Sequence, residues 1–461
     1  MQYFGFVDLL VTPLALFIIY AFARQIKNKN IDEYPEYKYF IAGLTVKIVG
    51  AVSLCIIYGL YYSGGDTINY YYDSLVMVKL LAKNPAGFYE IITSGTSDRN
   101  YLYFDGETGW PHYFRDRPTF MVVRIVCLIV LFAFKSIIVS NIYVAVLSFW
   151  GVWKLYKVFV AEFPSLTKEM AIAILFIPSV FFWGSGILKD TITFSMTGFY
   201  LHSFYYTFVK RKLGIGKIIL LFISSYLILL IKPYIILALI ASSAVWLAMM
   251  YIGKIKGGMA RTAVTPVLVI VSAFLGYTFL NSLGTQLGVY SVDKVLERAV
   301  VTQRDLKSDY YRGNSFDIGE FDATFSSMLG KAPIAIASAL FRPTLLEVHN
   351  PVMFVSGLEN AFFLFFTIRI LFRTRIFGFL LFFAKHHLLT FSIVFSLFFA
   401  FSVGISTSNF GSLVRYRIPI LPFYVASLYI IHYYFSLSAK KKKDKLKDEL
   451  EHIAARRTVV T

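Results

Sequence analysis

Residues 388–405 read LLTFSIVFSLFFAFSVGI, a run without a single charged side chain. A run of this length and hydropathy is typical of a helix that crosses a membrane. Ten further predominantly apolar runs of similar length lie near residues 4–23, 40–61, 137–153, 169–186, 191–209, 218–231, 234–252, 263–281, 352–368 and 418–437. The sequence therefore predicts an all-α polytopic membrane protein with about 11 transmembrane helices, in which residues 1–438 form the membrane domain.

The composition agrees with this prediction. Of the 461 residues, 57% are hydrophobic and only 16% are charged, whereas soluble domains carry about 25% charged residues. The formal charge of +18 comes mostly from basic residues in short segments between the apolar runs. Because this arrangement orients a membrane protein and meets lipid headgroups, membrane lipid is an expected partner and nucleic acid is not. Cys55 and Cys127 lie in apolar runs without metal-ligand spacing, which argues against a disulfide framework or a zinc site.

A shorter apolar run, residues 119–134, contains Arg124, and its path decides on which side of the membrane everything after it lies. If this run does not cross, the positive-inside rule places most of the basic segments on one side, which is then the cytoplasm. We therefore predict a juxtamembrane helix here, an extracytoplasmic N-terminus and a cytoplasmic C-terminus. Two large loops, residues 62–118 and 282–351, then lie outside, and residues 439–461 form a basic cytoplasmic tail.

The first predicted outer loop begins with Gly64-Gly65-Asp66, directly after a predicted span. Glycines let the backbone turn sharply, so the next carboxylate can face a substrate that arrives from the bilayer. Asp66 is the leading catalytic candidate, and the alternative is that it caps a helix starting at Thr67. Asp73 lies two helical turns further on and could share the same face, as a second group for base catalysis or metal binding.

Several charged residues in short outer turns run against the general charge pattern. Lys189 and Asp190 follow a predicted span, at a boundary where a charged pair is costly unless it is used or mutually neutralised. Lys232, Arg415 and Arg417 occupy two other outer turns. These cations are candidates for binding a lipid phosphate, and Asp190 is a third catalytic candidate. A plain interfacial ion pair and snorkelling toward headgroups are the alternatives.

The end of the second predicted outer loop holds three more candidates for substrate binding, Arg342, Glu347 and His349. They could line a cleft, or the prolines around them could simply stiffen the loop. The first loop adds aromatic residues such as Tyr101 and Trp110, whose rings could stack on a carbohydrate or anchor at the membrane interface.

The order of these features resembles the GT-C superfamily of membrane glycosyltransferases. It is similar in particular to the bacterial relatives of protein mannosyltransferases and aminoarabinose transferases, and also to bacterial exopolysaccharide-assembly membrane proteins. The resemblance rests on Asp66 in the first large outer loop, the juxtamembrane helix after it, Asp190 at a later outer helix end, and the segment RYRIP at residues 415–419. It covers roughly residues 40–435.

In that superfamily the first-loop carboxylate acts on the acceptor as a base or metal ligand, and outer basic residues hold the lipid phosphate of the sugar donor. The resemblance implies the first role for Asp66 and makes Lys189, Arg415 and Arg417 candidates for the second. It also implies a cytoplasmic (inner) membrane enzyme that moves a sugar from a polyprenyl-phosphate or -pyrophosphate donor to a glycan, lipid or protein acceptor. No cofactor is certain, and a divalent metal stays open. The chain departs from the superfamily in its additional first span and in Gly65-Asp66-Thr67, which replaces the usual acidic doublet.

Two other functions stay open. A polymerase of O-antigen or exopolysaccharide repeat units uses the same kind of lipid-linked donor and differs in its acceptor. A transporter or flippase is the third reading, because Asp8, Lys47 and Glu359 lie within predicted spans and could belong to a translocation path. Paired halves with matching broken helices, which many transporters have, are not evident in the sequence.

Overall fold

The computed structural model describes residues 4–252, 315–383 and 386–458, together with positions 267, 271, 297, 300, 301 and 305. These residues are almost entirely helical, and none of them forms a β-strand. An isolated antiparallel bridge joins Ser315 to Asn409. The predicted all-α class is therefore confirmed for the described part of the chain.

Seven helical segments in the described residues are long and apolar enough to cross a membrane. They coincide with seven of the predicted spans, which supports a multi-pass membrane protein. In chain order they lie in α1 (Phe6–Asn30), α2 (Phe40–Ile56) with its flanking turns, α7 (Ile137–Glu162), α12 (Pro233–Ile252), α17 (Pro351–Phe383), α18 (His387–Ser406) and α20 (Ile420–Thr458).

The other predicted spans are shorter or broken. Residues 169–186 form α8 (Thr167–Leu175) and α9 (Pro178–Trp183) instead of one helix, because Pro178 lacks an amide hydrogen and disfavours a helical residue before it. The next two predicted spans become α10 (Lys189–Phe204), which continues into η4 (Tyr205–Val209), and α11 (Ile215–Ile231). The span predicted at 263–281 lies outside the described residues.

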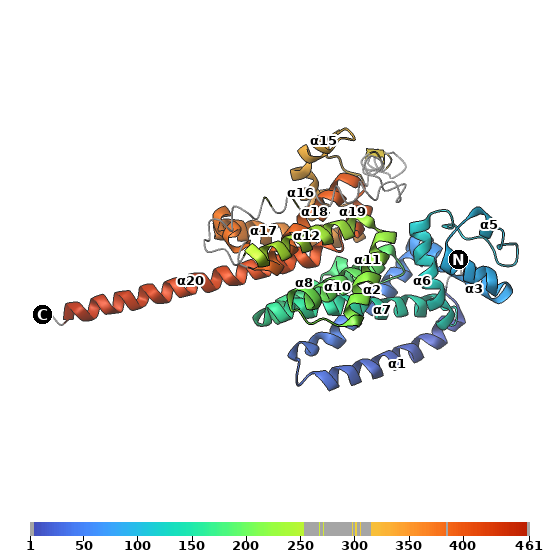
Figure 1. The fold of residues 1–461 in the computed structure, drawn as a ribbon, viewed down its shortest axis with the longest axis horizontal. Coiled ribbons are helices and arrows are strands. Elements are labelled where there is room, and N and C mark those ends of the chain that lie inside the picture. Colours follow the sequence, from blue (N-terminus) through green and yellow to red (C-terminus); the bar gives the residue numbers. More distant parts are fainter. Residues whose placement is uncertain are drawn as a thin grey trace.

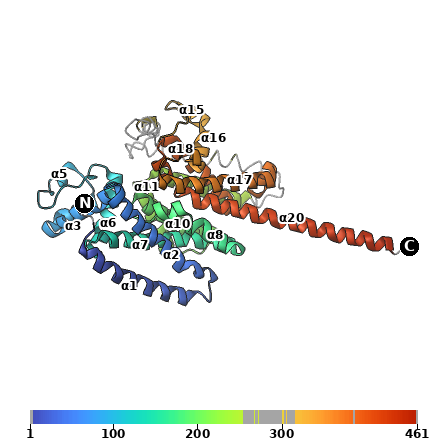
Figure 2. The same ribbon diagram turned by 180° about the vertical axis from the view of Figure 1, so that it is seen from behind.

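The two chain termini lie at opposite ends of the helical bundle (Figure 1, Figure 2). One end carries α3 (Asp66–Lys83) and α5 (Asp98–Tyr101), and we call it the loop end. From the other end α20 projects as a single helix toward the C-terminus, and we call this the tail end. Because α20 runs unbroken to Thr458, most of the predicted basic tail is helical.

The first predicted outer loop folds into α3, α4 (Pro85–Ser94) and α5, and is followed by α6 (Arg117–Phe132), which packs along α3. Just before α6, the N–H of Tyr113 donates to the Asp73 carboxylate on α3 over 2.9 Å. Just after α6, the Lys135 carbonyl accepts from the Tyr71 hydroxyl, also on α3, over 2.5 Å. The chain on both sides of α6 thus contacts α3 at the loop end, and the juxtamembrane position predicted for 119–134 stays a prediction.

The described part of the second predicted outer loop is more regular than expected. It contains α15 (Phe325–Gly330), α16 (Ala332–Phe341) and η7 (Leu345–Glu347). The apolar helix α16 packs closely on α18, where a Cβ on Gly404 would lie 2.1 Å from the carbonyl oxygen of Ala335. Glycine at this position lets the two backbones touch, as small residues do between membrane helices.

Two acidic residues within the predicted spans bond to helix beginnings. The Asp8 carboxylate accepts from the Ser136 hydroxyl over 2.5 Å and from the N–H of Ile138 over 3.2 Å, at the start of α7. The Glu359 carboxylate accepts from the hydroxyl and the N–H of Ser179, over 2.5 Å and 2.9 Å, in the first turn of α9. Both carboxylates therefore satisfy amide groups that a helix leaves unpaired at its N-terminus.

Candidate functional site

An irregular segment, residues 184–188, precedes α10 and fixes where that helix begins. The ammonium of Lys47 on α2 donates to the carbonyl of Gly184 over 2.5 Å. The side-chain oxygen of Asn141 on α7 accepts from the N–H of Ile187 over 3.0 Å. Non-helical backbone is tolerated inside a membrane bundle only where its polar groups find such partners. The buried Lys47 therefore has a structural partner in this segment.

The glycine turn predicted before Asp66 is present. Gly64 and Gly65 have φ angles of +154° and +104°, and α3 begins at Asp66. A Cβ on Gly65 would also lie 2.7 Å from the Tyr58 ring, so both the conformation and the space require glycine. Asp66 is the first residue of α3, with Gly65 as the N-cap, so it does not take the N-cap position that the alternative interpretation assigned to it.

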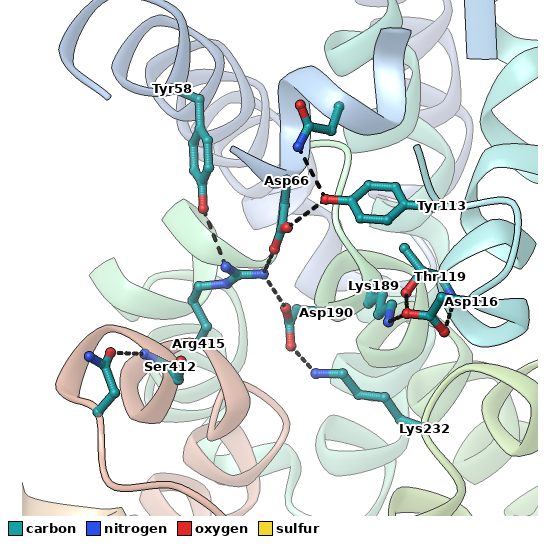
Figure 3. Close-up of polar contacts among 12 residues, drawn as sticks. Tyr58, Asp66, Tyr113, Asp116, Thr119, Lys189, Asp190, Lys232, Ser412 and Arg415 are labelled. Carbon is teal, nitrogen blue, oxygen red and sulfur yellow. Dashed lines mark hydrogen bonds and ion pairs between the residues drawn. The ribbon is translucent and has the colours of Figure 1, made fainter. Parts of the chain in front are cut away.

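The Asp66 carboxylate binds two side chains that come from distant parts of the sequence (Figure 3). Arg415, in α19 (Phe410–Tyr416), donates through Nη2 to Oδ2 of Asp66 over 2.7 Å. The Tyr113 hydroxyl donates to Oδ1 over 3.1 Å. Arg415 also donates through Nη1 to the Tyr58 hydroxyl over 3.4 Å. The carboxylate is thus held on both oxygens.

Asp190 lies on the other side of the same guanidinium. Its Oδ2 is 3.6 Å from Nη2 of Arg415, and its Oδ1 accepts from the ammonium of Lys232. Only 1% of the Asp190 side chain is exposed, so this charge depends on its partners. Lys189 instead pairs with Asp116 over 3.8 Å (Figure 3). The neighbours Lys189 and Asp190 therefore bind different partners and do not form the plain pair considered from sequence.

These residues lie together at the loop end, and we call them the polar cluster. Contacts that meet at Arg415 link six of them, and Lys189 and Asp116 form a separate pair beside these (Figure 3). The cluster combines three cationic side chains with three carboxylates, and two tyrosine hydroxyls complete it. Its members are Lys189, Lys232, Arg415, Asp66, Asp116, Asp190, Tyr58 and Tyr113.

Helix beginnings add positive potential to the polar cluster. Asp66 and Lys189 are the first residues of α3 and α10, and Lys232 directly precedes Pro233, the first residue of α12. The N-terminus of a helix carries a partial positive charge and favours anions. The side-chain charges of the cluster balance one another. The partial positive charges of the helix N-termini therefore favour binding of a negatively charged group there.

Protonation states in the polar cluster follow from burial and from neighbours. Burial alone would raise the pKa of Asp66, but the Arg415 guanidinium and the Tyr113 hydroxyl outweigh it and hold this pKa below its ordinary value of 3.8. Burial raises the pKa of Tyr113 to about 12, so its hydroxyl stays a donor at neutral pH. Burial lowers the pKa of Lys189. Asp66 is therefore ionised at neutral pH.

Four buried polar atoms around the cluster have no hydrogen-bond partner among the described residues. They are Oδ2 of Asp190, Nε of Arg415, and the hydroxyls of Thr67 and Thr191, which follow the two acidic residues in the chain. An unpaired buried polar group costs free energy. Both donors and acceptors are thus left for a polar ligand to satisfy.

Asp73 reaches the cluster only indirectly. Its carboxylate is fully buried and accepts from the N–H groups of His112 and Tyr113, over 2.8 Å and 2.9 Å. The Nδ1 atom of His112 lies 2.9 Å from the same carboxylate. The geometry therefore gives Asp73 a positioning role, because it anchors the segment that presents the Tyr113 hydroxyl to Asp66.

The four remaining candidates lie apart from the contacts that build the polar cluster. Arg342 donates through Nε to Glu347 over 2.8 Å, and His349 is exposed. Arg417 is fully buried and donates to the carbonyl of Arg342 over 2.9 Å, next to the end of α16. Arg415 and Arg417 diverge because residues two apart point to different sides of a helix.

Sequence reasoning did not single out Tyr58 and Tyr113. The chain has 32 tyrosines, and no local pattern separates these two from the rest. Among the described residues, no three or more His, Cys, Asp or Glu side chains are grouped to hold a metal ion. Comparison with models of protein families, with curated proteins and with solved structures finds no match.

Proposed function

We propose that this chain is an integral membrane glycosyltransferase acting at the polar cluster. It would move a sugar from a polyprenyl-phosphate or -pyrophosphate donor to an acceptor on the extracytoplasmic side, in the assembly of a cell-surface polysaccharide or glycolipid. One observation carries the proposal: an ionised Asp66 binds Arg415, which also contacts the buried Asp190–Lys232 pair, and Lys189 lies beside them, at one end of an apolar helical bundle (Figure 3). The bundle offers a place for a prenyl chain, and the cations suit its phosphate.

The transfer step would use these groups as follows. The acceptor hydroxyl oxygen forms a bond to the anomeric carbon of the sugar, and the bond from that carbon to the phosphate oxygen breaks. The electron pair stays on the phosphate, where Arg415 and Lys232 stabilise the charge, and the hydroxyl proton passes to Asp66. A lipid phosphate is already a good leaving group, so the protein mainly has to align and deprotonate the acceptor.

Arg415 links phosphate binding to the basicity of Asp66 in this scheme. The Arg415 guanidinium lies 2.7 Å from the Asp66 carboxylate and makes it a weak base. A phosphate that draws Arg415 away would remove the main interaction that lowers the pKa of Asp66. The carboxylate would then become more basic at the moment when the donor is in place.

The transporter reading has less support. Asp8 and Glu359 bond to helix beginnings, and Lys47 bonds to the irregular segment before α10. These bonds explain why charged groups lie within the spans, and no transport path is needed to account for them. A repeat-unit polymerase shares the proposed chemistry and differs in acceptor, so the experiment must separate the two.

The test is complementation of a deletion strain with the wild-type chain or with Asp66→Asn, followed by analysis of its surface glycans. We expect Asp66→Asn to accumulate in the membrane at normal levels and to lower sugar transfer at least about 100-fold, the contribution of a general base. Asp98→Asn, an exposed change at the same end, is the control and should restore the glycan. Loss of one sugar indicates a transferase, and a ladder that collapses to single repeats indicates a polymerase. Full restoration by Asp66→Asn would refute the proposal.

A further inference from the structure

A second group of basic side chains lies at the tail end of the bundle, far from the polar cluster. Lys154 and Lys157 stand near the end of α7, and Lys217 stands in the first turn of α11. Helix α7 packs on α10, where His202 lies near the end, and Lys217 and His202 both contact the Tyr206 ring. We call Lys154, Lys157, Lys217 and His202 the basic group.

Tyrosines around the basic group hold two of its three lysines in place. The ammonium of Lys157 lies 4.4 Å from the ring centre of Tyr34, and that of Lys217 lies 5.6 Å from the ring centre of Tyr206. The His202 and Tyr206 rings are 4.8 Å apart. Cation–π contacts of this kind fix an ammonium without neutralising it.

The positive charge of the basic group is mostly uncompensated by neighbouring carboxylates. Glu36 lies 4.0 Å from Lys157, and Glu162 is already paired with Lys210 over 2.8 Å. The lysines of the group are all half-buried, so water screens their mutual repulsion less than it does at an open surface. The Nδ1 atom of His202 is also buried and has no hydrogen-bond partner among the described residues.

Exposed apolar side chains lie beside the basic group, in a segment that also carries the exposed cations Lys210, Arg211 and Lys212. Phe208, Leu213 and Ile215, in and around the turn between α10 and α11, are 46%, 74% and 80% exposed. Lysines beside exposed apolar side chains suit an amphiphile, which brings a negative headgroup together with an acyl chain. A soluble anion would pair with the lysines but would leave the apolar side chains without a partner.

We propose that the basic group binds the phosphate of an anionic phospholipid in the membrane leaflet at the tail end. Lys154, Lys157 and Lys217 surround the phosphate, and the exposed Phe208, Leu213 and Ile215 contact the first part of the acyl chains. This inference does not depend on the proposed glycosyltransferase activity, since it concerns the opposite end of the molecule.

Native mass spectrometry of the full chain in a neutral detergent tests the proposal. The probes are phosphatidylglycerol, phosphatidylcholine and inorganic phosphate, each added separately to the wild-type chain and to Lys154→Gln/Lys157→Gln/Lys217→Gln. The matched control is Arg24→Gln/Lys27→Gln/Lys29→Gln, which removes the same number of charges from α1 at the same end. Thermal unfolding of each variant confirms that it is folded, and Lys217→Gln alone replaces the triple variant if that one is not.

We expect the wild-type chain to bind phosphatidylglycerol more strongly than phosphatidylcholine. The triple variant should bind phosphatidylglycerol at least about tenfold more weakly than the wild-type chain does. The single variant should lose a smaller part, and the control should retain most of the affinity. If inorganic phosphate binds and phosphatidylglycerol binds no more strongly than phosphatidylcholine, the site takes a soluble phosphate and the lipid assignment fails. Equal losses in the triple variant and the control, or no loss in either, would overturn the site itself.

Discussion

The guanidinium of Arg415 lies 2.7 Å from the carboxylate of Asp66, although 349 residues separate the two in the sequence. This contact joins the first large loop to the segment before the last helix. Arg415 also lies 3.6 Å from Asp190 at the start of α10, so one side chain links three distant segments. The integrity of the polar cluster therefore depends more on Arg415 than on any other of its members.

The first prediction concerns the stability that Arg415 provides. Replacing it by methionine leaves Asp190 buried with less compensation, and removing one partner of a buried ion pair costs about 3–5 kcal/mol in the free energy of unfolding. We expect Arg415→Met to lose stability of this order in a denaturant titration in detergent. Arg99→Met removes the same charge from an exposed position at the loop end and should change stability by less than about 0.5 kcal/mol. Equal effects of the two changes would show that Arg415 is not a structural link.

The second prediction concerns the buried pair of Asp190 and Lys232. Each single change, Asp190→Asn or Lys232→Met, leaves a buried charge without this partner, whereas the double variant removes both charges. We expect the double variant to be more stable than the sum of the single effects implies, by about 1–3 kcal/mol. A double-mutant cycle of unfolding free energies measures this coupling. Additive effects would mean that Arg415 alone compensates Asp190.

The sequence singled out the charged residues of the polar cluster other than Asp116, but not their partners. Asp190, Lys232 and Arg415 stand out because each is charged at the edge of an apolar run, where such groups are costly. Their pairing depends on how helices far apart in the chain pack together, and no local pattern carries that information. The sequence likewise grouped Arg417 with Arg415, although their side chains enter different surroundings.

Helices were predictable for a related reason. Long apolar runs need a helix in a membrane because every backbone polar group must be satisfied internally, so α7, α18 and α20 coincide with predicted spans. The break between α8 and α9 was less evident, since a proline can end a helix or only bend it. Here Lys47 stabilises the irregular segment after the break through a contact 137 residues away in sequence.

The third prediction concerns the turn before Asp66. Gly65→Ala places a Cβ at a φ of +104° and within 2.7 Å of the Tyr58 ring. We expect a loss of about 1–3 kcal/mol in unfolding free energy, the cost of holding a residue with a Cβ in a backbone region that is essentially restricted to glycine. Gly216→Ala in the first turn of α11 meets open space and should be neutral or slightly stabilising. A stable Gly65→Ala variant would show that the turn has room to adapt.

The fourth prediction separates positioning from catalysis at Asp73. Asp73→Asn keeps the shape of the side chain but removes the charge that accepts from the N–H groups of His112 and Tyr113. We expect it to lower the protection of these two amides in hydrogen-exchange mass spectrometry and to lower glycan synthesis only partly. Tyr113→Phe should reproduce the partial loss of synthesis without the change in exchange. A complete loss of synthesis in Asp73→Asn with unchanged exchange would instead indicate a direct chemical role.

The fifth prediction concerns the pH dependence of the contact between Asp66 and Arg415. Because the folded-state pKa of Asp66 lies below its ordinary value of 3.8, ionised Asp66 stabilises the fold above that value, and the contribution is lost as the pH falls through the folded-state pKa. We expect the stability difference between the wild-type chain and Asp66→Asn to be constant from about pH 8 to pH 5 and to shrink only below about pH 4. In the Arg415→Met background, the guanidinium no longer offsets the effect of burial on the pKa of Asp66. The contribution of ionised Asp66 to stability should then become unfavourable, or be lost at a higher pH than in the wild-type chain. Unfolding midpoints measured across this pH range decide the matter, and identical pH profiles in the two backgrounds would show that Arg415 does not control the charge of Asp66.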